Sequence, residues 1–135
     1  MPTKPSVLFV CVKNGGKSQM AAGLMRKVAG DAVAVDSAGT KPGDTVNELS
    51  AQALEEVGVD ITGRVPKSIT ASMVRDADLV VILGRDARVD QIPGTRFEIW
   101  DTDEPSERGI DGVERMRLIR DDIAARVTRL VQENP

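Results

Sequence analysis

The chain has 135 residues, of which 41% are apolar and 29% are charged, a composition typical of one soluble globular domain spanning residues 1–135. The formal net charge of −3 favours neither nucleic-acid nor membrane binding, and the longest apolar runs, 7–10 and 79–83, are far shorter than a membrane span. One cysteine and no histidine exclude an internal disulfide, a Cys–His pair and a cysteine or histidine metal site, and the N-terminus lacks a signal-peptide core. We therefore expect a cytoplasmic protein without a metal.

The first two predicted elements are a strand and a helix. The apolar run 6–10 predicts a buried strand. Residues 18–29 predict a helix whose buried face carries Met20, Leu24 and Val28, because these residues recur at helical spacing.

A second strand and a second helix follow. Residues 33–36 predict the strand, and Asn47 has the side chain of a helix cap. The expected buried stripe of the helix after this cap is formed by Leu49, Ala53 and Val57.

The second half of the chain contains two further strands and a long helix. In order, it predicts a loop over 60–67, a short helix over 70–76, a strand over 78–83, at most one helical turn within 85–94, a strand over 97–100 and a polar loop over 101–111. Residues 113–132 predict a long helix with an inward face of Met116, Ile119, Ile123, Val127 and Leu130.

This alternation of strands and helices predicts an α/β protein, a three-layer sandwich with a four-stranded parallel sheet between helices. In such sheets ligands bind beyond the carboxyl ends of the strands. The segment 11–18, Cys-Val-Lys-Asn-Gly-Gly-Lys-Ser, follows the first strand and opens the first helix. It therefore lies where this rule places a ligand site.

The segment has the composition of an oxyanion-binding loop. Gly15 and Gly16 allow backbone N–H groups to turn inward, the helix N-terminus adds a partial positive charge, and Lys17 adds a full one. The candidate oxyanion-binding residues are Val12, Lys13, Asn14, Gly15, Gly16, Lys17 and Ser18. The same field favours the thiolate form of Cys11, which is then a nucleophile directed at the central atom of the bound anion.

Two neighbouring side chains suit the support of this loop. Ser18 is able to donate a hydrogen bond to the Cys11 thiolate, and the Asn14 amide is able to hold the shape of the loop. The simpler alternatives are that Ser18 is only a helix cap and Asn14 only a turn residue.

The Gly-Lys-Ser ending also fits a nucleotide-binding Walker loop. That interpretation is weaker for two reasons. Cys11 stands where the Walker loop has its first glycine, and the strand 78–83 is followed by Gly84 rather than by a magnesium-binding aspartate.

The residues from Val10-Cys11 to Lys17-Ser18-Gln19-Met20-Ala21 resemble the active-site loop of low-molecular-weight tyrosine-phosphatase-fold proteins, and more narrowly that of their arsenate reductase branch. The resemblance continues through the segments 36–40, 53–58, Lys67, 78–83 and 100–105. It implies the strand order 2-1-3-4. It also makes Ser37, within the segment 36–40, a third candidate for loop support.

The departures from the family pattern narrow this resemblance. The family loop normally ends in Cys-x5-Arg, and Lys17 keeps the charge of that arginine without its two-pronged donor fork. Thioredoxin-coupled arsenate reductases carry two further cysteines, but here Gly84 stands at the first position and the stretch 85–92 has none. The reducing thiol must therefore come from another molecule.

The family's proton donor is an aspartate immediately before a proline in the last loop of the site. Here Glu104 precedes Pro105, so Glu104 is the first candidate for the proton donor and Asp103 the second. The alternative is that Asp101, Asp103 and Glu104 form a solvated acidic turn.

A lysine-containing loop with one cysteine resembles the arsenate–mycothiol transferases of actinobacteria. This resemblance implies that arsenate binds over Lys17 and the loop amides, that Cys11 is the nucleophile, and that mycothiol, a co-substrate rather than a bound cofactor, forms an arseno-thiol adduct. A mycoredoxin then reduces the adduct. Cys11 either forms a covalent bond to arsenic or only assists the thiol. The other functions to be weighed are a low-molecular-weight phosphatase and a non-catalytic oxyanion-binding module.

Overall fold

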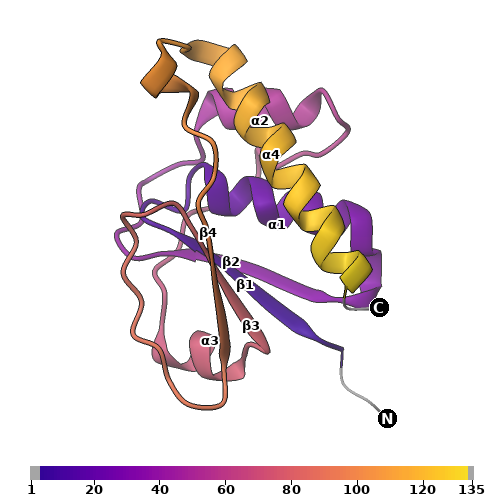
Figure 1. Ribbon diagram of the computed structural model, residues 1–135, viewed down its shortest axis with the longest axis vertical. Coiled ribbons are helices and arrows are strands. Elements are labelled where there is room, and N and C mark those ends of the chain that lie inside the picture. Colours follow the sequence, from indigo (N-terminus) through magenta and orange to yellow (C-terminus); the bar gives the residue numbers. More distant parts are fainter. Residues whose placement is uncertain (1–3, 134–135) are drawn as a thin grey trace.

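The computed structural model describes residues 4–133, which form a parallel sheet with helices on both faces (Figure 1). In chain order the elements are β1 (Ser6–Cys11), α1 (Lys17–Ala29), the 3-10 helix η1 (Gly30–Ala32), β2 (Ala34–Gly39), α2 (Glu48–Glu55), α3 (Ala71–Asp76), β3 (Leu79–Leu83), β4 (Arg96–Trp100), the 3-10 helix η2 (Pro105–Arg108) and α4 (Gly112–Glu133). No helix within residues 4–133 is long and apolar enough to cross a membrane.

The four strands are parallel and lie in the order β2-β1-β3-β4, which confirms the predicted fold class and strand order. Strand β1 is central and pairs with β2 on one side and β3 on the other. Cys11, at the carboxyl end of β1, stands opposite Gly39, at the carboxyl end of β2. The loop that follows Cys11 therefore begins at the edge of the sheet where parallel strands place ligand sites.

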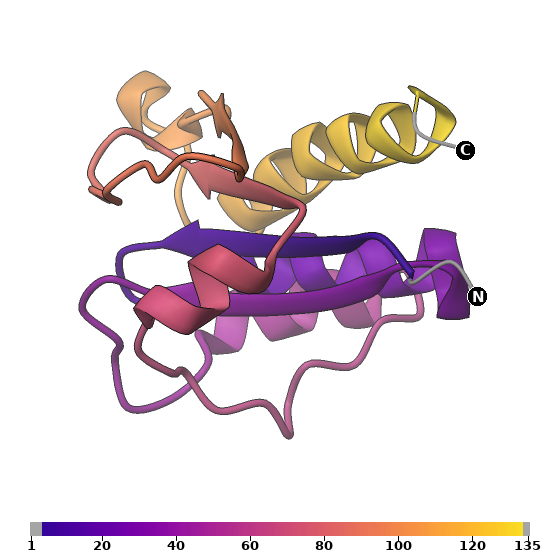
Figure 2. The same cartoon turned by 90° about the horizontal axis from the view of Figure 1, so that it is seen from below.

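The side chains of β1 alternate between two cores. Val7 and Phe9 face α1, α2 and α4, whereas Leu8 and Val10 face the side covered by α3, which lies in front of the strands in Figure 2. On the first side Phe9 packs against Trp100, with ring centroids 5.7 Å apart. Burial of such side chains contributes about 1.5–3 kcal/mol each to folding. The sheet that they stabilise fixes the position of Cys11, where the loop begins.

The long helix α4 buries the five side chains that the sequence predicts for its inner face. Asn47 also caps α2 as predicted, because its side chain accepts a hydrogen bond from the Ser50 N–H. These two local patterns are confirmed.

The predicted buried faces of α1 and α2 are wrong in part. Val28 is 45% exposed, because α1 is buried on nearly all sides along Ser18–Met25 and only its last turn reaches solvent. Leu49 is 36% exposed, and Val57 lies beyond the end of α2 and is half-buried. The stripe that α2 buries consists of Ser50, Ala53 and Leu54.

The segment 85–94 contains no helical turn, within the prediction of at most one. The predicted polar loop 101–111 differs from the structure because it contains η2, which starts at Pro105 and ends before Gly109. Proline suits the first position of a helix because it has no N–H to satisfy there. This 3-10 helix lies in the connection between β4 and α4.

Candidate active site

The segment 12–16 curls around the Cys11 thiol. Cys11 is the last residue of β1 and is 8% exposed. Its Sγ lies 2.9 Å from the Ser18 Oγ and accepts a hydrogen bond from the Asn14 N–H at 3.3 Å. Both partners are able to donate a hydrogen bond to the sulfur.

The carbonyls of this loop point away from the thiol. Those of Cys11, Val12, Lys13 and Gly15 accept hydrogen bonds of 3.1, 2.8, 2.9 and 2.7 Å from the backbone N–H groups of the segment 40–47. Within a planar trans peptide the C=O and the following N–H point in opposite directions. The N–H groups of Val12, Lys13, Asn14 and Gly16 are therefore directed to the other side, where Asn14 reaches Sγ. Convergent amides of this kind form an anion-binding concavity.

Asn14 holds the loop in this shape. Its backbone has φ 53°, a left-handed conformation that asparagine tolerates better than most residues, and its side chain is fully buried. Its Oδ1 accepts hydrogen bonds from the Lys67 N–H at 3.0 Å and the Gln19 Nε2 at 3.3 Å, and its Nδ2 donates to the Ser18 Oγ at 2.7 Å. The predicted shape-holding role agrees with these contacts.

Ser18 is the second residue of α1 and not its cap, since Gly16 occupies the cap position. The interpretation of Ser18 as only a cap is therefore wrong. Because its oxygen accepts from Asn14, its own proton is available to the Cys11 sulfur.

Ser37 lies two residues before the end of β2, opposite Phe9, and among the described residues no hydrogen bond joins its hydroxyl to the loop. Close support from β2 comes instead from Gly39. A Cβ at this position would lie 2.6 Å from the Val12 oxygen and 3.0 Å from Asn14 atoms. The loop therefore packs against β2 at a distance that only glycine permits.

Lys17 begins α1, and its ammonium pairs with the Glu104 carboxylate. On the other side it is close to Gly84, where a Cβ would lie 3.7 Å from the Lys17 nitrogen. Gly84 has φ +87°, which disfavours any residue with a Cβ. The backbone at this position thus disfavours a cysteine.

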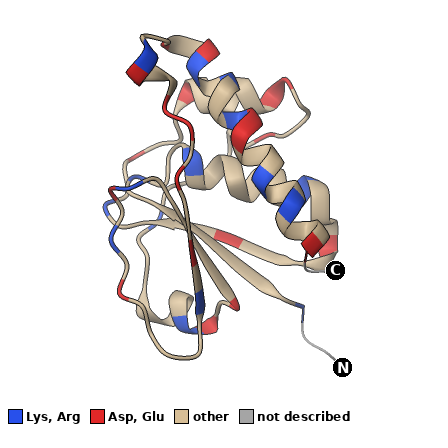
Figure 3. Cartoon of the chain, viewed as in Figure 1, with Lys and Arg blue, Asp and Glu red and all other residues tan. Residues whose placement is uncertain are grey.

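Three carboxylates of the segment 101–104 each pair with an arginine from a different part of the chain. Asp101 binds Arg85 through two 2.9 Å bonds. Asp103 binds Arg108 at 2.7 and 3.1 Å. Glu104 binds Lys17 and, at 3.3 Å, Arg115 of α4. Figure 3 shows acidic positions along the segment that leaves β4 and basic positions in η2 and α4.

Of the two candidate proton donors, Glu104 lines the cavity above Cys11 and Asp103 does not. Burial raises the pKa of Glu104, but the hydrogen bond and charge of Lys17, together with those of Arg115, outweigh it and the pKa is lowered. Hydrogen bonding from Arg108 lowers the pKa of Asp103. Both groups are ionised in the free protein at neutral pH, so the acidic turn is neither unpaired nor simply solvated.

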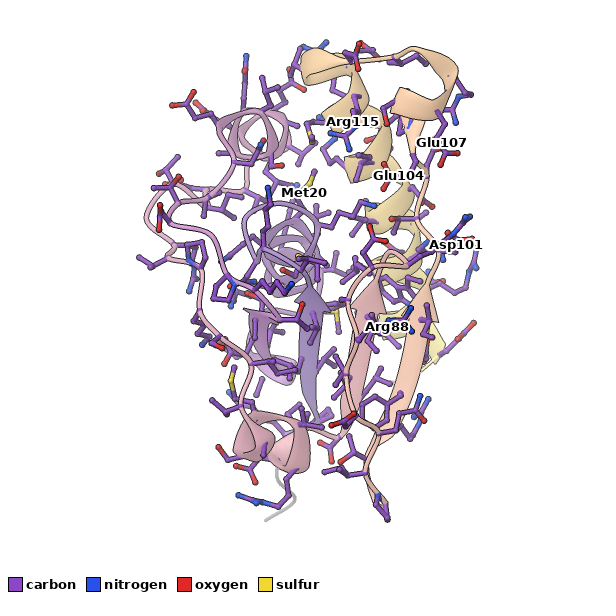
Figure 4. The ribbon with its side chains drawn as sticks, turned by 90° about the vertical axis from the view of Figure 1, so that its left-hand side faces the viewer. Met20, Arg88, Asp101, Glu104, Glu107 and Arg115 are labelled. Atoms are coloured by element: carbon purple, nitrogen blue, oxygen red, sulfur yellow. The ribbon has the colours of Figure 1, made fainter. Side chains whose placement is uncertain are left out.

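The cavity beside the thiol has a volume of about 940 Å³. It extends from the loop 11–17 across the start of α2 to the first turn of α4, and the segments 84–86 and 101–107 contribute to its wall. Figure 4 shows Glu104, Glu107 and Arg115 on the wall formed by η2 and α4, with Met20 of α1 across from them. Cavities of about 300–1,000 Å³ hold ligands of drug size, so this one holds more than a tetrahedral oxyanion.

Sequence reasoning missed Arg115 and Thr102, and it assigned no role to Gln19 and Gly39, although both lie within segments that carry the family resemblance. Arg115 belongs to a helical pattern in which charged residues are ordinary surface residues, and Gly39 is one of 12 glycines. No local spacing signals that these residues meet at one site.

Residues 6–134 match the family model described as low molecular weight phosphotyrosine protein phosphatase. The arsenate reductase of Bacillus licheniformis is 32% identical over 139 residues, which cover 96% of this chain and 97% of that protein.

Two solved structures have the same fold. The thioredoxin-dependent arsenate reductase of Corynebacterium glutamicum has a TM-score of 0.81 and 32% identity, and the match covers 96% of this chain but 61% of that one. An arsenate reductase in the phosphate binding state has a TM-score of 0.81 and 29% identity, with coverage of 97% and 99%.

Proposed function

Because this chain belongs to the low-molecular-weight phosphotyrosine protein phosphatase family, we propose that it is an arsenate reductase that uses Cys11 and a thiol supplied by another molecule. The observation that supports this proposal best is the arrangement around Cys11. The sulfur lies beside the Ser18 hydroxyl and the Asn14 N–H, inside a loop in which four carbonyls are held by the segment 40–47 and turned away from it.

Arsenate, a tetrahedral oxyanion, matches the donors of this loop. Its oxygens would take hydrogen bonds from the inward N–H groups and from Lys17, with the arsenic in front of Sγ. Removal of one well-placed donor in such a site costs about 3 kcal/mol of transition-state stabilisation. The electrostatic contribution of the loop is therefore the largest single contribution to the rate.

The leaving oxygen needs a proton. When Sγ attacks arsenic, an As–O bond breaks and the oxygen departs as water after it has received a proton from Glu104 or Asp103. Glu104 is the better donor because it lines the cavity. An anion bound beside Glu104 competes for Lys17 and repels the carboxylate, so substrate binding raises the pKa of Glu104 and promotes its protonation.

The second thiol comes from outside the chain, because Cys11 is its only cysteine. We propose that mycothiol takes over the arsenic centre and leaves as an arseno-thiol adduct. A mycoredoxin thiolate then attacks the sulfur of the adduct and forms a disulfide, and two electrons pass to arsenic, which leaves as arsenite. The size of the cavity supports a small thiol as co-substrate.

The test is arsenite formation from arsenate with mycothiol plus mycoredoxin, glutathione plus mycoredoxin, or thioredoxin supplied in turn. We expect turnover with mycothiol plus mycoredoxin, and none with Cys11→Ser. Turnover by Cys11→Ser at the wild-type rate would contradict the role of Cys11, and turnover with thioredoxin alone would contradict the choice of thiol.

A phosphatase activity is the second candidate, because the family model is that of a phosphatase. None of the residues that line the cavity is aromatic, which gives a phosphotyrosine ring no flat surface. Hydrolysis of an aryl phosphate without added thiol would favour this candidate. Lys17→Arg, which restores the donor fork, should increase that hydrolysis.

The third candidate is a non-catalytic oxyanion-binding module. Tight arsenate binding that Cys11→Ser leaves unchanged, with no turnover by the wild-type protein under any thiol, would favour it. The contacts of Cys11 with the Ser18 hydroxyl and the Asn14 N–H count against it, because a purely structural cysteine at a strand end needs neither.

A further inference from the structure

Among the cations that line the cavity, Arg115 shares the Glu104 carboxylate with Lys17, yet the proposed mechanism leaves it without a role. Arg115 lies in the first turn of α4, and its Nη2 donates to Glu104 Oε2 at 3.3 Å. Lys17 pairs with the other oxygen, Oε1. One carboxylate thus bridges two cations, one from the start of α1 and one from the first turn of α4; Figure 4 shows Arg115 and Glu104 close together on the side of η2 and α4.

Two buried polar atoms without a partner in the described part of the chain belong to residues of the same cavity lining. Within residues 4–133, the Arg115 Nε and the Thr102 Oγ1 are the buried side-chain nitrogen and oxygen atoms without a hydrogen-bond partner. Both residues line the cavity, and Thr102 is directly followed by the segment that carries Glu104. A buried donor left without a partner costs about 1–3 kcal/mol. Two such atoms in one cavity lining, one of them on a cation that already holds a carboxylate, indicate that the cavity takes a polar ligand.

The position of Arg115 is fixed by the residue that follows it. Met116 is 8% exposed and packs into the core, and its sulfur accepts a hydrogen bond from the buried Ser50 hydroxyl at 3.4 Å. The first turn of α4 is thereby fastened to α2. The Arg115 side chain leaves this anchored turn and enters the cavity as a half-exposed group.

We propose that Arg115 is a second oxyanion-binding residue, which together with Lys17 forms a two-cation clamp, and that Glu104 occupies this clamp until the oxyanion arrives. The guanidinium supplies the planar pair of donors that the ammonium of Lys17 lacks. A tetrahedral oxyanion presents two oxygens to the clamp, as the carboxylate does. When the anion enters, Glu104 gives up its hold on both cations and the Nε gains an acceptor.

The clamp makes Arg115 a residue that determines specificity for doubly charged tetrahedral anions. It rests on the proposed oxyanion-binding function of the loop, so the experiment must separate the two. The single cysteine provides the means, because alkylation by iodoacetamide reports on Cys11 alone. An anion that sits in the loop should protect the thiol, and inorganic phosphate serves as an unreactive probe.

The variant is Arg115→Gln, and its matched control is Arg117→Gln. Arg117 lies on the same helix, pairs with Glu56 and Glu114, and is outside the cavity lining. We expect Arg115→Gln to raise the phosphate concentration for half-protection by about tenfold or more, the loss expected for one charge-assisted hydrogen bond. Arg117→Gln should change it by less than about twofold, as expected for an exposed charge.

Arg115→Lys keeps the charge and the fold while it removes the fork, so it should recover only part of the protection. If phosphate half-protects Cys11 at the same concentration in Arg115→Gln and in Arg117→Gln, the clamp is overturned, because any loss of protection would then reflect only the change in net charge. Wild-type protection in Arg115→Lys would overturn the use of the guanidinium fork. If neither phosphate nor arsenate protects the wild-type thiol, the oxyanion function of the loop fails and the clamp fails with it.

Discussion

Replacement of Asn14 by alanine tests how the loop keeps its shape. The change removes three side-chain hydrogen bonds from a fully buried residue. It leaves the Lys67 N–H and the buried Gln19 amide without their acceptor. It also places a Cβ without a local hydrogen bond at φ 53°.

The magnitude follows from these contacts. Each lost hydrogen bond costs about 0.5–1.5 kcal/mol net, and a buried donor left unpaired costs about 1–3 kcal/mol. The left-handed backbone adds about 1–2 kcal/mol for a residue such as alanine. With allowance for partial relaxation, the total loss of unfolding free energy is about 3–5 kcal/mol. Asn14→Gly keeps the backbone conformation and should lose about 1 kcal/mol less than Asn14→Ala.

Urea unfolding followed by fluorescence measures this loss, since Trp100 is the only tryptophan and is buried. The control is Asn47→Ala, which removes a single cap hydrogen bond and should cost about 1 kcal/mol. A loss for Asn14→Ala no larger than that for Asn47→Ala would refute this reasoning. A larger loss for Asn14→Gly than for Asn14→Ala would refute the backbone part of it.

Three further predictions concern the thiol, the strand beneath the loop and acid stability. Ser18→Ala removes the hydroxyl beside Sγ and should slow Cys11 alkylation at neutral pH by about tenfold; an unchanged rate would contradict the role of the hydroxyl. Gly39→Ala forces the loop away from β2, so phosphate should lose its protection of Cys11 while the sheet remains folded by circular dichroism; retained protection would contradict the close contact. Hydrogen bonds from Arg117 and Arg120 of α4 lower the pKa of Glu56 from its ordinary value of 4.5 to about 2. This ion pair therefore contributes fully above about pH 4.5 and is lost as pH falls towards 2, so Glu56→Gln should flatten the decline of unfolding free energy in that range, and an unchanged slope would contradict the pairing.

The sequence predicts the layers of this fold well because they depend on local patterns. Strong apolar runs specify the inner strands β1 and β3, and helical spacing specifies the inner face of α4. The prediction fails for Val28 and Leu49, where the surroundings rather than the spacing decide burial. Helix α1 is enclosed on several sides, so its periodicity does not identify its exposed turn.

The site residues also fall into two groups, those that a local motif predicts and those that only the folded chain brings together. Cys11, Asn14, Lys17 and Ser18 lie within eight consecutive residues, so one motif contains most of the loop chemistry. Arg115 is 98 residues beyond Lys17 along the chain, and only the path through β4 and η2 brings the two to one carboxylate. The sequence proposed two acids, and the folded chain distinguishes them because Glu104 alone of the two faces the cavity.

The central claim is that Cys11 acts on arsenate with a thiol from another molecule. It is tested most directly by measurement of arsenite produced from arsenate by the wild-type protein and by Cys11→Ser, with mycothiol and mycoredoxin present. Thioredoxin in place of these two serves as the comparison. The account predicts arsenite formation by the wild-type protein with mycothiol and mycoredoxin, and none by Cys11→Ser. No arsenite from the wild-type protein with any thiol, or equal amounts from the two proteins, would contradict it.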